Sequence, residues 1–156
     1  MPKLYARESR PRHPFHEIYE HTVDYDAHFH SDTDVKRAIA GYAGLVSAMD
    51  ENVGLVLGAL ASAGLASDTR VIYTSDHGDN LGARGLWGKS TFYEESAGVP
   101  LLMAGPDIAA GRVVDTPVSL IDCAPTILEA AGAPLPRGRD ALPVPADARY
   151  AGPVHV

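Results

Sequence analysis

Apolar residues recur at three- and four-residue steps along one stretch of the sequence, between residues 35 and 60. This period predicts a long amphipathic helix over about residues 32–63, with its apolar stripe packed in a core. Ser31 and Asp34 have the spacing of a capping box at its start, and Gly64 suits a left-handed stop at its end. The stripe consists of Val35, Ile39, Tyr42, Leu45, Val46, Met49, Val53, Leu57 and Leu60.

Two short apolar runs follow this helix and predict buried strands, one over residues 70–74 and one over residues 99–104. The intervening FYEES predicts a helical turn. A second helix is expected within residues 119–132, capped by Ser119 or Asp122. Helix, strand, loop, strand and helix together predict an α/β domain with a mostly parallel sheet.

The two ends of the chain lack these patterns. Residues 1–30 hold five of the seven histidines without a helical or alternating period, so we expect an irregular segment there. The spacing of these histidines matches no compact set of metal ligands. Residues 134–156 are rich in proline and predict a loose tail, which leaves residues 31–133 as the folded domain.

Charge and cysteine content narrow the classes of function. The 156 residues carry a net charge of −7, which argues against general binding of nucleic acid or anionic membranes. The single cysteine excludes an internal disulfide framework. No stretch of eighteen consecutive apolar residues and no signal peptide is found, so we expect a cytoplasmic protein that does not contact a membrane.

Candidate chemistry follows the first predicted strand directly. Asp76 and His77 stand at its carboxyl end, the edge at which open α/β sheets bind ligands. A carboxylate and an imidazole suit a divalent cation, and Asp79 offers a third oxygen. Lys89 lies thirteen residues after Asp76, beyond a glycine-rich loop. Its ammonium group would supply the positive charge that an anionic ester needs beside such a cation.

These residues carry a family resemblance. The stretch YTSDHGDNLGARGLWGKSTFYEESAGVPLLMAGP, followed by VDTPVSLIDCAPTILEAAG, closely resembles the sulfatase family of the alkaline-phosphatase-like superfamily, in the C-terminal part of its catalytic domain. The resemblance covers about residues 35–133 and implies part of an α/β/α sandwich. It implies that Asp76 and His77 bind a metal, most often Ca²⁺ and sometimes Mn²⁺ or Mg²⁺. It also implies that Lys89 is a catalytic residue that contacts the anionic oxygens of the ester.

The family pattern is incomplete in this sequence. Family members carry a C/S-x-P-x-R motif whose Cys or Ser becomes formylglycine, and this sequence contains no such motif. Cys123 and Pro125 mimic its first part, but Ile127 replaces the arginine. We therefore expect formylglycine in a segment outside this chain, and we interpret Cys123 as a small packed residue.

The sequence thus predicts a hydrolase of small-molecule sulfuric esters that contributes metal- and anion-binding residues without the nucleophile. A phosphonate or phosphate ester hydrolase of the same superfamily is the nearest alternative. A noncatalytic metal-binding remnant is the second. Because an isolated Asp-His pair often only caps a turn, the metal site depends on this context. The predicted strands lack neighbours, so we also expect self-association through an exposed sheet edge.

Overall fold

The computed structural model describes residues 2, 13–24, 27–134 and 154–155. The chain divides into two compact units. The first unit contains residues 1–59 and 79–89, and the second contains residues 60–78 and 90–156. The glycine-rich loop therefore belongs to a different unit from the strand that precedes it.

The longest element is helix α2, Asp32–Ser62, and both of its ends form as the sequence predicts. At its start, the Ser31 hydroxyl donates to the Asp34 carboxylate at 2.8 Å and accepts from the Asp34 N–H at 3.3 Å. At its end, Gly64 takes a φ of 71°, and the Leu65 N–H donates to the Leu60 carbonyl at 3.1 Å. Local capping chemistry therefore fixes the length of this helix.

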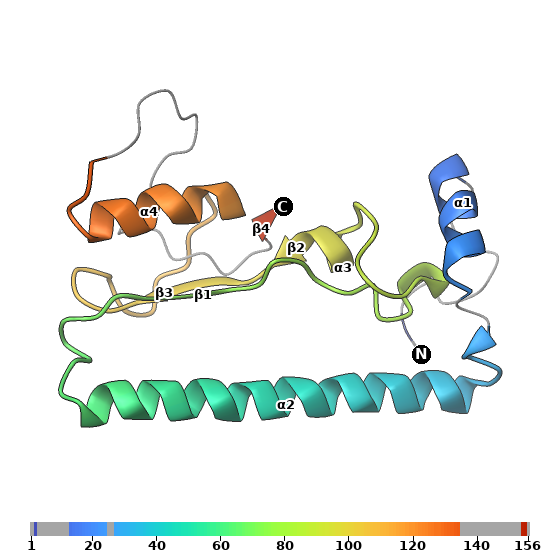
Figure 1. The fold of residues 1–156 in the computed structure, drawn as a ribbon, viewed down its shortest axis with the longest axis horizontal. Helices are drawn as coiled ribbons and strands as arrows, with labels where there is room; N and C mark the ends of the chain where they lie inside the picture. Colours follow the sequence, from blue (N-terminus) through green and yellow to red (C-terminus); the bar gives the residue numbers. More distant parts are fainter. Residues whose placement is uncertain (1, 3–12, 25–26, 135–153, 156) are drawn as a thin grey trace. The chain divides into compact units, whose positions relative to one another are not determined.

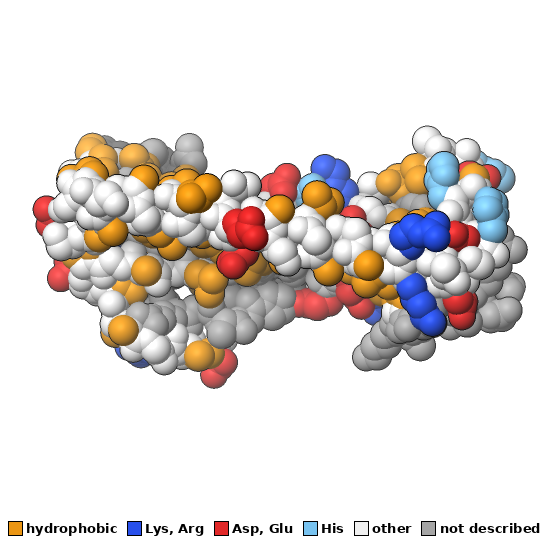
Figure 2. Space-filling model, turned by 90° about the horizontal axis from the view of Figure 1, so that it is seen from below, with side chains coloured by type: hydrophobic (Ala, Val, Ile, Leu, Met, Phe, Trp, Pro, Cys, Tyr) orange, Lys and Arg blue, Asp and Glu red, His pale blue; other side chains and the backbone are white. Residues whose placement is uncertain are grey.

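The predicted packing of the apolar stripe on α2 is not found in the part of the chain that the structure describes. Val35 is fully buried, whereas Leu45 is 71% exposed. Figure 2 looks onto this helix and shows apolar side chains along it. By length and composition alone α2 could cross a membrane. Asp50 and Glu51 lie near its middle, however, and charges at that depth of a bilayer are costly.

A short helix corrects the expectation of an irregular segment over residues 1–30. Helix α1 covers Pro14–Thr22. Pro14 stands in its first turn, where the missing N–H costs nothing, and the Nδ1 atom of His13 accepts the Phe15 N–H at 3.2 Å. The proline that suggested irregular backbone therefore begins a helix instead.

The second unit contains two antiparallel strand pairs rather than the predicted mostly parallel sheet (Figure 1). Strand β1, Val71–Thr74, pairs with β3, Leu101–Ala104, in the register Val71 to Ala104. The helices in the connection between them are the four-residue helix α3, Glu94–Ala97, and the three-residue 3₁₀ helix η3, Ala83–Gly85. A parallel pair is usually joined by a crossover helix that packs on the sheet, and this connection has no helix longer than four residues.

Proline divides the second predicted strand. Pro100 separates β2, Gly98–Val99, from β3, and β2 pairs antiparallel with β4, Val154–His155. The strand β4 lies within the tail that the sequence predicts to be loose, while residues 135–153 of that tail lie outside the described residues. The last two described residues are thus joined to the rest of the second unit by a sheet.

One small core holds the second unit together. Val99, Leu101 and Val118 form its buried centre. Helix α4, Cys123–Ala130, follows the 3₁₀ helix η4, Leu120–Asp122. As predicted, Ser119 and Asp122 cap the start of this helical segment, at η4. The Ser119 N–H donates to the Asp122 carboxylate at 2.8 Å. The partly buried residues Ile72, Met103, Val114, Leu120 and Cys123 pack around the centre.

Candidate metal and anion site

The turn after β1 is built by hydrogen bonds around Asp76 and His77. The Ser75 hydroxyl donates to the His77 carbonyl at 2.9 Å. The His77 N–H donates to the Asp76 Oδ1 atom at 3.0 Å. These bonds close a tight turn that sets the backbone of both predicted metal ligands. Sequence reasoning did not single out Ser75, because a hydroxyl before an Asp-His pair has no distinctive signal.

The two ring nitrogens of His77 have different surroundings. Nδ1 lies 2.8 Å from the Gly78 carbonyl oxygen, which only accepts, so the ring proton is on Nδ1. In the neutral ring Nε2 then carries the lone pair; this atom lies 3.4 Å from Asp76 Oδ2. A metal-binding histidine typically donates its other ring N–H to a carbonyl in this way. The Asp76 side chain is 82% exposed and that of His77 is 37% exposed, so both are accessible to a solvated ion.

The chemistry of this pair fits a divalent cation. A lone pair and a carboxylate oxygen 3.4 Å apart repel each other unless a positive charge lies between them. Either a proton on the imidazole or a cation bound by both atoms provides that charge. Within the described residues, no group of three or more His, Cys, Asp or Glu side chains is placed to hold a metal. As a metal site, the pair alone would therefore be an incomplete ligand set.

Gly78 holds the turn against the chain near α3. Its N–H donates to the Ser96 carbonyl at 2.8 Å. A side chain at this position would collide with the Glu95 carbonyl oxygen. Only glycine permits this close approach of the backbone to α3.

The glycine-rich loop, residues 79–88 in the first unit, is closed at its neck. Asp79 Oδ1 accepts the Leu81 N–H at 2.7 Å and the Gly88 N–H at 3.2 Å. The buried Asn80 donates twice to the Gly88 carbonyl, from Nδ2 at 2.6 Å and from its backbone N–H at 2.9 Å. Asp79 therefore orders the loop. The sequence did not identify Asn80.

Trp87 anchors the same loop. Its ring stacks on that of Phe29, with centroids 4.1 Å apart and an interplanar angle of 11°. Leu86, beside it, is 1% exposed. Phe29 was not predicted, because residues 1–30 have no period that would place an aromatic residue against this loop.

Lys89 follows the closed loop and is exposed. It ends the loop segment of the first unit, whereas Asp76 and His77 belong to the second. The structure thus brings the two predicted metal ligands together in one turn. The anion-binding role of Lys89 stays a prediction.

Cys123 has the environment of a packed residue. It begins α4 and lies against the core around Leu101 and Val118. Burial, with a smaller contribution from the charge of Asp122, raises the pKa of its thiol above 9.0. The thiol is therefore protonated at neutral pH, unlike an activated nucleophile.

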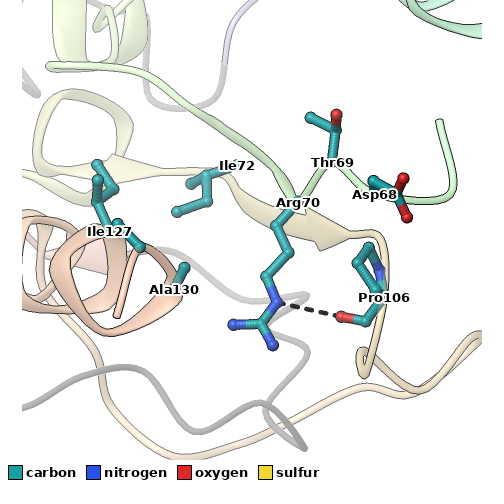
Figure 3. A pocket seen from close by; sticks show the side chains of 8 residues that line it. Asp68, Thr69, Arg70, Ile72, Pro106, Ile127 and Ala130 are labelled. Carbon is teal, nitrogen blue, oxygen red and sulfur yellow. Dashed lines mark hydrogen bonds between the residues drawn. The ribbon is translucent and has the colours of Figure 1, made fainter. Parts of the chain in front are cut away.

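A hollow of about 420 Å³ lies near the opposite end of β1 from the Asp-His pair (Figure 3). Arg70 is its cationic residue, but its Nε–H donates to the Pro106 carbonyl at 3.1 Å and its Nη2 pairs with Asp107 at 3.2 Å. The partners of the guanidinium weaken its attraction for an anion. The hollow is lined by Asp68, Thr69, Arg70, Ile72, Pro106, Ile127, Ala130 and Ala131.

These features, helices and short strands around a turn with an acidic and an imidazole side chain, are those of an α/β domain, and comparison with known proteins gives its family. A model of the sulfatase family matches residues 10–133. This chain belongs to the sulfatase family.

Several proteins of established name are similar to the chain. It is 41% identical to choline-sulfatase of Rhizobium meliloti over 111 residues, which are 71% of this chain and 22% of that protein. It is 42% identical to human arylsulfatase K over 104 residues, 67% of this chain and 19% of that protein. Mouse steryl-sulfatase is 38% identical over 90% of this chain and 26% of its own length. The chain thus spans about a fifth to a quarter of these relatives.

Solved sulfatase structures show the same fold. A sulfatase in complex with its substrate D-glucosamine-2-N,6-O-disulfate is 35% identical, with a TM-score of 0.57 over 67% of this chain and 23% of that chain. A 2-O GAG sulfatase is 27% identical, with a TM-score of 0.66 over 76% of this chain and 26% of its own. The described residues therefore form part of an alkaline-phosphatase-like domain.

Proposed function

We propose that this chain supplies the metal-binding and anion-binding part of an enzyme that hydrolyses sulfuric esters. Asp76 and His77 hold a divalent cation, and Lys89 contacts the anionic oxygens of the ester. The nucleophile, a formylglycine, belongs to a segment outside this chain. Membership of the sulfatase family supports the reaction class, and the turn after β1 supports the metal role.

The arrangement of His77 is the observation that carries the metal role. Nδ1 lies 2.8 Å from the Gly78 carbonyl oxygen, which leaves Nε2, 3.4 Å from the Asp76 carboxylate, as the ring nitrogen for a cation. A bound divalent cation would supply electrostatic stabilisation of the ester oxygens. We propose Ca²⁺ because Asp76 offers a hard, accessible oxygen, with Mn²⁺ and Mg²⁺ as alternatives.

Lys89 would add a second positive charge to the site. The ester carries a negative charge, and the net charge of the chain is −7, so local cations are needed to bind it. The similar proteins are named for choline, aryl and steryl sulfates, and one solved relative holds a sulfated glucosamine. We therefore propose a small-molecule sulfate ester as the substrate class, and a phosphonate ester is less favoured.

Calorimetric titration of the chain with Ca²⁺, and separately with Mn²⁺, tests the metal site. We expect saturable binding that Asp76→Ala and His77→Ala each abolish. Asp68→Ala is the matched control, because Asp68 is an exposed aspartate near the other end of β1. If Asp76→Ala binds both ions as the unaltered chain does, the metal role is wrong. Turnover of an aryl phosphonate in preference to an aryl sulfate by the full-length protein would instead overturn the substrate class.

A further inference from the structure

At the closed end of the glycine-rich loop, Asp79 and Asn80 fix the peptide group that joins Gly88 to Lys89. The carbonyl of Gly88 and the N–H of Lys89 belong to one planar peptide unit. That carbonyl accepts two hydrogen bonds from Asn80, at 2.6 Å from Nδ2 and 2.9 Å from the backbone N–H. Asp79 holds the other side of Gly88 by accepting its N–H at 3.2 Å. Both polar groups of Gly88 are therefore bound to the start of the loop.

The hydrogen bonds of Asn80 and Asp79 with Gly88 are sheltered, and the loop backbone that they hold is strained. Asn80 is 1% exposed, so its bonds to Gly88 are sheltered from competing water. Gly88 takes a φ of 74°, and Leu81 and Arg84 within the loop take φ values of 46° and 57°. Side-chain-bearing residues rarely adopt these values, which persist only where the surroundings enforce them. The bonds from Asp79 and Asn80 provide that enforcement.

We infer that Asn80 and Asp79 are positioning residues for the anion contact of Lys89. They do not touch the ester themselves. They hold the Gly88–Lys89 peptide in one orientation, so that the lysine side chain leaves a fixed backbone and only its own rotamers remain to be ordered at binding. This inference rests on the proposed anion-binding role of Lys89 and extends it to two residues that are not part of the ligand set.

Binding of inorganic sulfate tests this inference. The chain has three lysines, and ¹³C-dimethylation gives each a resolvable NMR signal, so the Lys89 signal can be followed through a sulfate titration. We expect Lys89→Ala to abolish the site-specific response, and Asn80→Ala to weaken sulfate affinity roughly tenfold. Lys36→Ala is the control cation and should leave the affinity unchanged.

Asp79 provides the second pair of variants, because Asn80→Ala could unfold the loop. Asp79→Ala removes the acceptor for Gly88 and should also weaken sulfate affinity roughly tenfold. Asp79→Asn keeps Oδ1 as an acceptor and should restore affinity to within about twofold, whereas a metal ligand would not tolerate the amide. The emission of Trp87, the single tryptophan, reports whether the loop remains packed in each variant.

The outcomes separate this inference from the proposed function. If Lys89→Ala binds sulfate like the unaltered chain, the role of Lys89 is wrong and the positioning role falls with it. If Lys89→Ala fails but Asp79→Ala and a folded Asn80→Ala bind normally, only the positioning role is overturned. Failure of Asp79→Asn with unchanged Trp87 emission also overturns it, because the acceptor would then be insufficient.

Discussion

The ring of Trp87 stacks almost parallel on the ring of Phe29, with the two centroids 4.1 Å apart. This contact joins the glycine-rich loop to a segment nearly sixty residues earlier in the sequence. It replaces a regular element as the support of the loop, because the loop contains only one three-residue 3₁₀ turn. The order of Lys89 therefore depends on an aromatic residue that lies outside the loop.

Phe29→Ala should release one face of Trp87. An aromatic pair contributes about 0.5–1.5 kcal/mol beyond its buried area, so we expect a loss of at least that size in the free energy of unfolding. The emission of Trp87 should shift to longer wavelength as its ring becomes hydrated. Phe92→Ala is the control, since Phe92 is 99% exposed. An equal spectral shift in both variants would contradict the supporting role of Phe29.

Gly78→Ala should damage the candidate metal site through the backbone. The added methyl group would overlap the Glu95 carbonyl oxygen, so the turn must open at a cost of about 1–3 kcal/mol. The displaced Gly78 carbonyl would no longer orient the His77 ring, and Ca²⁺ affinity should fall. Chemical denaturation and calorimetry measure the two effects.

Gly41→Ala is the matched control for this substitution. It lies inside α2, and a methyl group there would meet nothing within 4 Å. Alanine should stabilise the helix by about 0.5–1 kcal/mol and leave Ca²⁺ binding intact. Equal stability changes at positions 41 and 78 would rule out the proposed clash.

Acid should weaken the start of α2. The hydrogen bond from the Ser31 hydroxyl lowers the pKa of Asp34 below its ordinary value of 3.8. A carboxyl group with a depressed folded-state pKa stabilises the fold above its unfolded pKa, so this contribution is present above pH 3.8. It is lost as the pH falls below 3.8 through the folded-state pKa.

Ser31→Ala checks the origin of that shift. We expect the pKa of Asp34, followed by NMR of its carboxyl carbon, to rise toward 3.8. Ser47→Ala is the control, because the Ser47 hydroxyl donates to the Ala43 carbonyl within the helix and does not contact Asp34. An unchanged Asp34 titration in Ser31→Ala would show that the hydroxyl is not the main cause.

The exposed apolar face of α2 should make the chain self-associate and bind a hydrophobic dye. Leu45 and Leu55 are each 71% exposed, and patches of this kind are interaction surfaces or aggregation sites. Replacing both by Gln should reduce dye fluorescence and shift sedimentation toward the monomer without loss of helix. A chain that is monomeric, cooperatively folded and does not bind the dye would contradict this prediction.

Signals within a few residues of one another predicted much of the structure correctly. The cap at Ser31, the stop at Gly64 and the strand before Asp76 all depend on local chemistry. The Asp-His turn itself is local too, since both side chains leave the same end of β1. These are the parts that a sequence of this length specifies by itself.

The predictions that were wrong concern features that depend on residues far away in the sequence. Strand direction is set by the connection and by neighbouring strands, so the antiparallel pairing of β1 and β3 was not visible in their composition. The apolar stripe on α2 correctly predicted a helix. Burial of that stripe, however, requires other elements that pack on it, and this chain spans about a fifth of the length of the proteins to which it is similar. Asn80 escaped notice because one buried amide has no periodic signal.

Pro100 lies between two short strands that have different partners. Because proline has no N–H to donate, the ladder is interrupted there, and each side of the interruption can change neighbours independently. Removing residues 154–155 would deprive β2 of its partner and leave the ladder between β1 and β3 intact. Because of Pro100, the pairing of β1, the strand that leads into Asp76, does not depend on the pairing of β2 with the carboxyl-terminal strand β4.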